Sequence, residues 1–322
     1  MEKRDKRLLY ELEMNSRRSI SSIGKISRMS QQTADYKIKL LLKKDIIKNF
    51  VTIINYSTTD YLCFRVFFQL RQKMSDKYNS FIKMLKDHKN TLEISMVRSR
   101  YDLIVAFAYN NPLFFNTEFK KIVQENIELI KDYDIMTSVS QNYFGRKYLS
   151  PKSEIKNIFI GGEAKLIHLE PVDKRILFIL SRNSRIPIAE ICSDVNKSPS
   201  TVINKIKMMK KLGIILSYSC FINPISVDHH QYIILLRSKN LTLKLENNLA
   251  NFCIQNPNII SFVKTFGNWD YELTVETITP TEFRKIYENI RQRFEDIMDD
   301  FNILIVNDLI KSVFLPESFS QM

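Results

Sequence analysis

The chain is short of the residues that build metal sites, disulfide frameworks and membrane spans. Its four cysteines, Cys63, Cys192, Cys220 and Cys253, are scattered, with no Cys-x-x-Cys pair and no histidine at zinc-finger spacing. This pattern indicates neither a structural metal nor a disulfide framework. No run reaches about 18 apolar residues, and the charged first turns lack a signal-peptide core. We therefore expect a soluble, cytoplasmic protein without a membrane partner.

Glycine is scarce, with 6 residues in 322, and motifs that carry catalytic chemistry are missing. The sequence contains no glycine-rich phosphate loop, no nucleophile elbow and no pair of carboxylates at a catalytic spacing. We therefore predict that the chain is not an enzyme and holds no cofactor.

Basic residues are abundant, since the net charge is +13, and 44% of the residues are hydrophobic. This hydrophobic content can build sizeable cores, and the length allows two to four domains. The charge is compatible with nucleic acid, a membrane surface or an acidic small molecule as partner, or with a lysine-rich proteome alone. The position of the charge must decide between these.

An internal repeat organises the chain. Residues 5–55 match residues 173–223 without a gap, at a shift of 168, and about 20 of the 51 positions are identical. Shared composition would not give this agreement. We therefore read the chain as a duplication in which one structural explanation must serve both copies.

Each copy begins with three helical patterns and a strand. In the second copy, apolar residues recur at helical spacing over 172–183 and 188–195, and Ser198-Pro199 cap a third helix that ends before Gly213. A β-branched and aromatic run then follows. The first copy repeats the pattern with Ser30 as N-cap and with Asp45 in the place of Gly213. This order predicts a winged helix-turn-helix.

About 90 residues after each such unit read as strand, helix, strand, strand, helix, strand, which is the ferredoxin-like order. The first copy places these elements at 62–70, 76–86, 92–97, 101–108, 114–130 and 135–144, and the second at 232–237, 243–255, 259–265, 269–276, 280–294 and 301–309. Between the copies, 158–160 and 165–167 flank Gly161-Gly162 and predict a small hairpin that adds strands to a sheet edge.

The predicted fold is α+β, with two tandem units that each join a winged helix-turn-helix to a ferredoxin-like βαββαβ effector domain. The expected boundaries are 1–57 for the first winged helix-turn-helix, 58–146 for its effector domain, 147–170 for the connector, 171–225 for the second winged helix-turn-helix and 226–322 for its effector domain.

The layout resembles the leucine-responsive/asparagine-synthetase regulator family (Lrp/AsnC), and it does so twice. The likeness is carried by VDKRILFIL, by SPSTVINKIKMMKKLGII and by FGNWDYELTV. It implies a transcription regulator that pairs its ferredoxin-like sheets and often binds an amino acid or a related metabolite. The family usually has an arginine in the recognition helix where this chain has Lys37 and Lys205, and Ser99 replaces the glycine that the second copy keeps as Gly267.

The third helix of each copy is predicted to enter the major groove of double-stranded DNA. Both of these helices are basic, which favours DNA binding over a lysine-covered surface. The candidate DNA-binding residues are Gln31, Gln32, Thr33, Tyr36, Lys37 and Lys39 in the first copy and Ser198, Ser200, Thr201, Asn204, Lys205 and Lys207 in the second.

The second effector hairpin predicts a metabolite site at Gly267, Asn268 and Asp270. Glycine lets a ligand approach the backbone, and a carboxylate can hold an ammonium group. The alternative is a tight turn in which Asp270 is only a turn acceptor. Trp269 is expected in a core or an interface.

Fusion of two units allows the pairing that family members make between chains to form within one chain. We expect an intramolecular pseudo-dimer that reads two dissimilar half-sites, about one DNA turn apart, and that further assembles as a homo-oligomer. Two alternatives remain open. One is a siroheme-decarboxylase-like tetrapyrrole enzyme of the same layout, for which only His229-His230 is suggestive; the other is a ligand-binding or oligomerisation protein that does not bind DNA.

Overall fold

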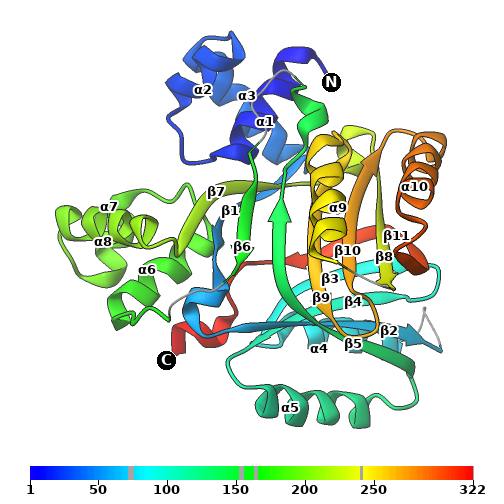
Figure 1. Ribbon diagram of the computed structural model, residues 1–322. Helices are drawn as coiled ribbons and strands as arrows, with labels where there is room; N and C mark the ends of the chain where they lie inside the picture. The colour runs from blue at the N-terminus through cyan, green and yellow to red at the C-terminus, as the bar shows by residue number, and fades with distance from the viewer. Residues whose placement is uncertain (72–75, 152–155, 163–165, 240–241, 322) are drawn as a thin grey trace.

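The computed structural model describes residues 1–71, 76–151, 156–162, 166–239 and 242–321 (Figure 1). Two helical heads project from a body of strands, which is covered by further helices. The first head comprises α1 (Lys3–Met14), α2 (Ile20–Ser27) and α3 (Gln31–Lys43), followed by the strand β1 (Ile47–Ile54). The second comprises α6 (Pro171–Arg182), α7 (Ile188–Val195) and α8 (Pro199–Lys211), followed by β7 (Ile215–Ile222).

The predicted helix starts and stops are confirmed in both heads. Ser30 and Ser198 are the N-caps of α3 and α8, and their hydroxyls accept hydrogen bonds from main-chain N–H groups three residues on. Beyond the helices, Gly213 has a φ of 72° and Asp45 a φ of 53°. The same left-handed turn therefore leads into the strand in both copies, with glycine in only one of them.

The predicted βαββαβ order is confirmed twice. The first copy contains β2 (Leu62–Leu70), α4 (Asp76–Asp87), β3 (Thr91–Arg98), β4 (Leu103–Tyr109), α5 (Pro112–Glu125) and β5 (Ile130–Tyr143). The second contains β8 (His230–Ser238), α9 (Leu243–Gln255), β9 (Ile259–Phe266), β10 (Tyr271–Thr277), α10 (Pro280–Phe294) and β11 (Met298–Ser312). Short 3-10 helices lie at Tyr56–Thr59, Lys147–Leu149, Ile225–Val227 and Glu317–Gln321.

Several predicted bounds and the predicted hairpin are wrong. The last strands of the two copies, expected at 135–144 and 301–309, span Ile130–Tyr143 and Met298–Ser312. The helix expected to reach residue 130 ends at Glu125. There the side-chain amide of Asn126 donates a hydrogen bond to the Ile122 carbonyl, and Ile130 already pairs with Leu70 at the start of β5. The connector contributes one strand, β6 (Ile158–Gly161), which pairs with β5. Of the other predicted hairpin arm, Lys165 lies outside the described residues, and residues 166–167 form no strand.

The two βαββαβ domains close into one antiparallel barrel. Its strand order is β2-β4-β3-β11-β8-β10-β9-β5, and an additional pairing of β5 with β2 closes the ring. The domains meet along two seams, β3 with β11 and β9 with β5. Helices α4 and α5 pack outside the first domain, and α9 and α10 cover the second (Figure 1). The predicted intramolecular pairing of the sheets is therefore present.

The strands that follow the two heads also pair with each other. β1 runs antiparallel to β7, and Val51 lies opposite its own repeat equivalent, Ser219. Another equivalent pair, Ser16 and Ser184, shares a hydroxyl hydrogen bond of 2.6 Å. Contacts between equivalent positions mark a pseudo-twofold axis, so the chain has the internal symmetry of a dimer.

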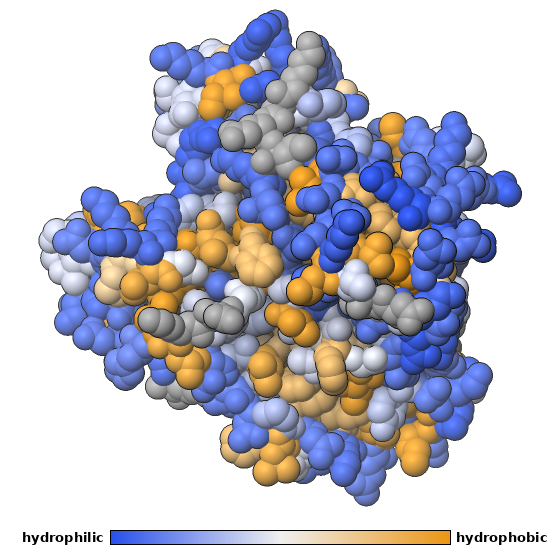
Figure 2. Space-filling model, viewed as in Figure 1, coloured by the Kyte–Doolittle hydropathy of each residue, from blue (hydrophilic) through white to orange (hydrophobic). Residues whose placement is uncertain are grey.

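The cores of the heads are interleaved across this axis. The first head packs on Cys220 and Ile222 of β7, and the second packs on Ile54 of β1. Hydrophilic residues cover most of the visible surface of the first head, whereas apolar residues gather around the second and its junction with the body (Figure 2). Because the core of each head includes apolar residues of the other repeat, we expect the two heads to keep a fixed position relative to each other.

Candidate functional site

Most predicted reading residues of the recognition helices are exposed to solvent. Those of the first head that are exposed are Gln31, Gln32, Thr33 and Tyr36, and those of the second are Ser198, Ser200 and Asn204. Thr201 is half-buried. Tyr36 is 63% exposed, although it is a large aromatic residue in a well-packed head. An exposed aromatic residue beside exposed amides is suited to contact base edges.

Lys37 and Lys205 face the first helix of their own head. The Lys37 ammonium lies 3.0 Å from Asp5, and Lys205 lies 3.0 Å from Asp173 and 2.7 Å from Glu170. The hydrogen bond to Asp5 raises the pKa of Lys37, and that to Glu170 raises the pKa of Lys205. These lysines therefore join helices within each head, which leaves less of their charge available for phosphate.

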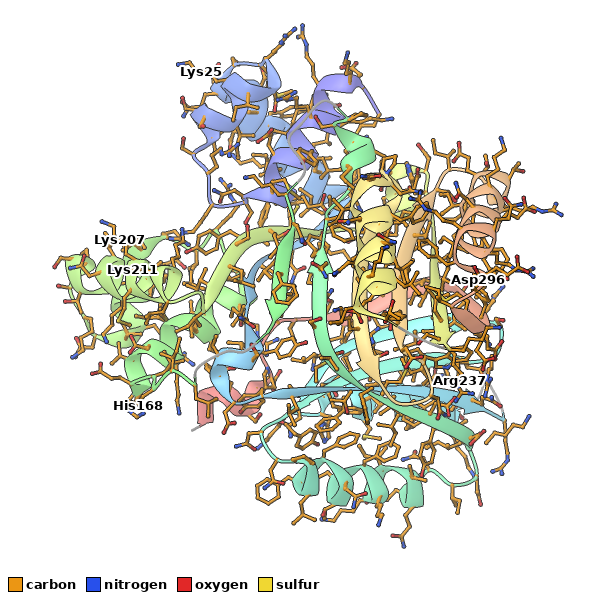
Figure 3. The ribbon with its side chains drawn as sticks, in the orientation of Figure 1. Lys25, His168, Lys207, Lys211, Arg237 and Asp296 are labelled. Carbon is orange, nitrogen blue, oxygen red and sulfur yellow. The ribbon has the colours of Figure 1, made fainter. Side chains whose placement is uncertain are left out.

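Lys39 and Lys207 are better placed for phosphate. The Lys39 side chain is 74% exposed, and its ammonium lies 2.7 Å from Asp35, one turn away on the same helix. Such an exposed ion pair contributes little to stability, so giving it up to contact a phosphate would cost Lys39 little. Lys207 is exposed on α8, where Figure 3 shows it projecting from the second head together with Lys211, away from the barrel.

The hairpin residues Gly267, Asn268 and Asp270 all make contacts with residues of the barrel strands. Gly267 has a φ of 150°, and a Cβ there would lie 2.7 Å from the Ile135 carbonyl oxygen on the facing strand. Asp270 Oδ2 accepts hydrogen bonds from Ser238 N at 2.7 Å and Ser238 Oγ at 2.8 Å. Asn268 donates to Asp134 of the first repeat. This geometry agrees with the turn-acceptor interpretation, and a metabolite site here stays an untested prediction.

Trp269 is buried where the repeats meet, in agreement with the core interpretation. It is 3% exposed, and its indole N–H donates to the hydroxyl of Tyr101, its repeat equivalent, at 3.3 Å. Burial raises the pKa of Tyr101 to about 12, and its hydrogen bond to Asp134 acts in the same direction. The tryptophan therefore belongs to the pseudo-twofold contact.

A cavity of about 190 Å³ occupies the head-side end of the barrel. Arg65 and Glu272 line it and form two hydrogen bonds of 2.9 and 3.0 Å, and Glu93 lies 3.6 Å from the same guanidinium. Burial lowers the pKa of Arg65, but the Glu272 and Glu93 carboxylates outweigh it and raise that pKa. Burial also raises the pKa of Glu272.

Arg146 lies at the same cavity and bridges two fully buried carboxylates. Its guanidinium contacts Glu13 at 2.6 Å and Glu276 at 2.8 and 2.9 Å. The hydroxyls of Tyr143 and Tyr148 donate to these same carboxylates, at 2.7 and 2.6 Å. The two buried arginines are thus matched by four carboxylates, and among the described residues that line the cavity there is no further lysine or arginine.

Sequence reasoning missed this polar centre, although the repeat contained a signal for it. The repeat equivalents of Arg65 and Glu272 are Ile233 and Ile104, which are buried apolar residues on the matching strands. A charged residue in one copy at the position of an isoleucine in the other marks a site at which the two copies are not equivalent. Comparing the copies along the strands would have revealed the asymmetry.

None of the four histidines lines this cavity. His229 stacks on Tyr148 and its Nδ1 lies 2.7 Å from the Val227 carbonyl, while His230 is exposed. His88 pairs with Glu118, and His168 lies on the second head (Figure 3). Within the described ranges no group of three or more His, Cys, Asp and Glu side chains could hold a metal ion, and no helix could cross a membrane.

Comparisons with known proteins agree with this geometry. A family model described as winged helix-turn-helix DNA-binding matches residues 169–215. The leucine-responsive regulatory protein of Haemophilus influenzae is 25% identical over 151 residues, which cover 46% of this chain and 89% of that protein. The HTH-type transcriptional regulator FL11 of Pyrococcus furiosus is 22% identical over 122 residues, covering 38% of this chain and 80% of that protein.

Solved structures of the siroheme decarboxylase NirDL are similar over the whole length. The siroheme decarboxylase NirDL superposes with a TM-score of 0.66 and 11% identity, and the match covers 99% of this chain and 96% of that one. At this identity the likeness shows the fold alone. The chain therefore has the Lrp/AsnC-type fold in two tandem units, as in NirDL.

Proposed function

We propose that this tandem pair of Lrp/AsnC-type units is a sequence-specific DNA-binding transcription regulator with two reading heads in one chain. The observation that carries the proposal is the pair of recognition helices, α3 and α8, which expose reading residues while their scaffolds are joined by the β1–β7 pairing. Partners related by an internal twofold axis are suited to DNA half-sites related in the same way.

The reading surfaces of the two heads differ. Gln32 and Tyr36 on α3 are replaced on α8 by the equivalent residues Ser200 and Asn204. Glutamine and asparagine amides are suited to adenine edges, so we expect A·T base pairs in both half-sites. We expect a non-palindromic operator with half-sites about one helical turn apart.

The test uses two matched pairs of lysines on the same two helices. Exposed Lys39 and Lys207 are repeat equivalents, and so are Lys37 and Lys205, which are paired with acids. In a salt titration with an A·T-rich duplex, Lys39→Ala with Lys207→Ala should lower the log–log slope by about 1.8, since each phosphate contact contributes about 0.9. Lys37→Ala with Lys205→Ala should change the slope less and lower the melting temperature more.

Two results would contradict the proposal. The wild type could fail to shift a duplex at low salt, which would favour a ligand-binding or oligomerisation protein. Alternatively, it could bind with a slope that neither pair changes, which would place DNA away from the recognition helices. Selection of bound sequences from a random pool would then identify the operator for wild type and for Gln32→Ala or Asn204→Ala.

The second candidate is a tetrapyrrole enzyme, and the full-length likeness to siroheme decarboxylase favours it at the level of fold. The chemistry of the barrel cavity speaks against it, because the two arginines are already neutralised and a polycarboxylate needs free cations. The NirDL structure was also determined with an iron-uroporphyrin III analogue. Titration of this chain with that analogue should leave its absorbance spectrum unchanged, and a saturable shift would support the enzyme.

A further inference from the structure

A second cavity, of about 230 Å³, lies where the second head meets the first repeat. We call it the head-junction cavity. Its lining residues are Asn15, Arg17, Ile188, Ile203, Ile206, Lys207, Lys210 and Tyr218. Asn15 and Arg17 follow α1 of the first repeat, whereas the others belong to α7, α8 and β7 of the second. A ligand in this cavity would touch both repeats.

Positive charge converges on the cavity without a carboxylate among the lining residues. The Arg17 guanidinium lies 5.6 Å from the centre of the Tyr218 ring, and the Lys210 ammonium lies 4.4 Å from it. Arg17 Nη1 is held by the carbonyls of Ser184 and Ile186, at 2.6 and 3.1 Å. Burial lowers the pKa of Lys210, and the nearby Arg17 lowers it further. An anion would relieve this repulsion.

The hydroxyl of Tyr218 is a second, independent sign of a missing partner. Tyr218 is 3% exposed, and its buried hydroxyl has no hydrogen-bond partner among the described residues. Leaving a buried donor unpaired is costly, so in a native protein such a group calls for a partner such as a bound ion, ligand or water. An anion held by Arg17 and Lys210 could accept this hydrogen bond.

The remaining wall is apolar. Ile188, Ile203 and Ile206 supply it, and Ile203 is 37% exposed at the rim. Specific ligand sites commonly combine such a wall with a few convergent polar groups. At about 30 Å³ for each molecule of liquid water, its volume corresponds to roughly eight waters, which is the size range of a small organic anion.

The equivalent place on the first head provides an internal comparison. There Arg185 lies over the ring of Phe50 at 5.4 Å, where the second head has Arg17 over Tyr218. Lys210 corresponds to Leu42, and Ile203 corresponds to Asp35. The first head therefore lacks the hydroxyl and one cation, and it adds a carboxylate. Only the second head keeps an anion-seeking arrangement.

We propose that the head-junction cavity binds a small organic anion, whose carboxylate contacts Arg17, Lys210 and the Tyr218 hydroxyl and whose aliphatic part lies on the three isoleucines. The ligand would tie α8 to the first repeat and so fix one head against the other. A DNA phosphate shares the anionic chemistry, but it has no aliphatic part for the isoleucine wall. Binding is measured without DNA, so the result does not depend on the proposed regulator function.

The probe is hexanoate, which has eight non-hydrogen atoms, titrated calorimetrically into the full-length chain. Its comparisons are hexanamide, hexylamine and inorganic phosphate. The test variant combines Lys210→Leu with Tyr218→Phe, which installs the residues of the first head. Lys211→Leu is the matched control, because it removes the same charge from the next, exposed position of α8. Ile203→Asp at the rim is a second test variant if the double variant does not fold.

We expect saturable hexanoate binding that is at least about tenfold weaker in the test variants and unchanged in Lys211→Leu. The neutral amide and the amine should bind more weakly than hexanoate. No hexanoate binding, equal binding of hexanamide, or equal binding of phosphate would each overturn the proposal. The last result would indicate a DNA-phosphate contact instead of an organic-anion site.

Discussion

Replacing Arg146 with methionine would leave two carboxylates buried without their cation. Glu13 and Glu276 are both 0% exposed, and Arg146 makes three of its side-chain hydrogen bonds to them. Removing one partner of a buried ion pair typically costs about 3–5 kcal/mol, because the remaining charge is uncompensated. We therefore expect Arg146→Met to lower the free energy of unfolding by about 4 kcal/mol near neutral pH.

The expected change in melting temperature follows from chain length. At about 2.1 cal/mol/K for each residue, unfolding of the whole chain has an entropy of about 0.7 kcal/mol/K. A loss of about 4 kcal/mol then lowers the melting temperature by about 6 °C. Differential scanning calorimetry measures this directly, and it also tests whether the chain unfolds as one cooperative unit.

Arg175→Met is the matched control for this prediction. Arg175 also forms two hydrogen bonds to a carboxylate, Asp194, at 2.6 and 2.7 Å, but its side chain is 46% exposed. Exposed pairs contribute about 0–1 kcal/mol, so the control should shift the melting temperature by about 1 °C. Adding Glu13→Gln and Glu276→Gln to Arg146→Met should recover part of the loss. Equally small shifts in melting temperature for Arg146→Met and Arg175→Met would contradict the expected cost of the unpaired buried carboxylates.

Three further predictions concern the backbone, the thiols and one buried lysine. Gly267→Ala should cost about 2–4 kcal/mol by thermal melting, because its Cβ would meet a main-chain oxygen at a φ of 150°, whereas Gly213→Ala, with open space, should cost about 1 kcal/mol. Burial raises the pKa of Cys63 to about 11, so a thiol reagent at about pH 8 should modify half-buried Cys192 first, as read by mass spectrometry. Burial lowers the pKa of Lys147 to about 8, so the unfolded chain binds more protons above that pH. Wild type should therefore gain stability relative to Lys147→Met as pH rises from about 8 towards 10.5, and parallel curves would contradict this.

The duplication and the order of elements were determined by the sequence. Local signals sufficed for this: Ser30 and Ser198 cap the recognition helices, and Gly213 and Asp45 lie just beyond the ends of these helices, as expected. These features depend on residues close in the chain, so propensity and spacing reveal them. The prediction of a helix up to residue 130 was wrong because Ile130 pairs with β2, a strand distant in the sequence, and this pairing outweighed the local helical pattern.

The partners of individual side chains were decided only by the tertiary structure. Lys37 and Lys205 had the charge expected of phosphate contacts, but Asp5 and Asp173 lie beside them because α1 and α6 pack against the recognition helices. Asp270 accepts two hydrogen bonds from Ser238, a contact that no local pattern specifies, and its predicted role towards a ligand stays untested. Composition and periodicity do not specify such contacts, since they depend on how helices and strands are placed in space.

The differences between the two repeats were determined partly by the sequence and partly by the tertiary structure. The sequence shows the repeat and also the equivalent positions at which its copies differ, such as Arg65 and Ile233, or Tyr218 and Phe50. Only the closed barrel and the crossed β1–β7 pairing show that these differences line two cavities. The sequence determined two similar units, and the long-range packing of one against the other decided where they are not equivalent.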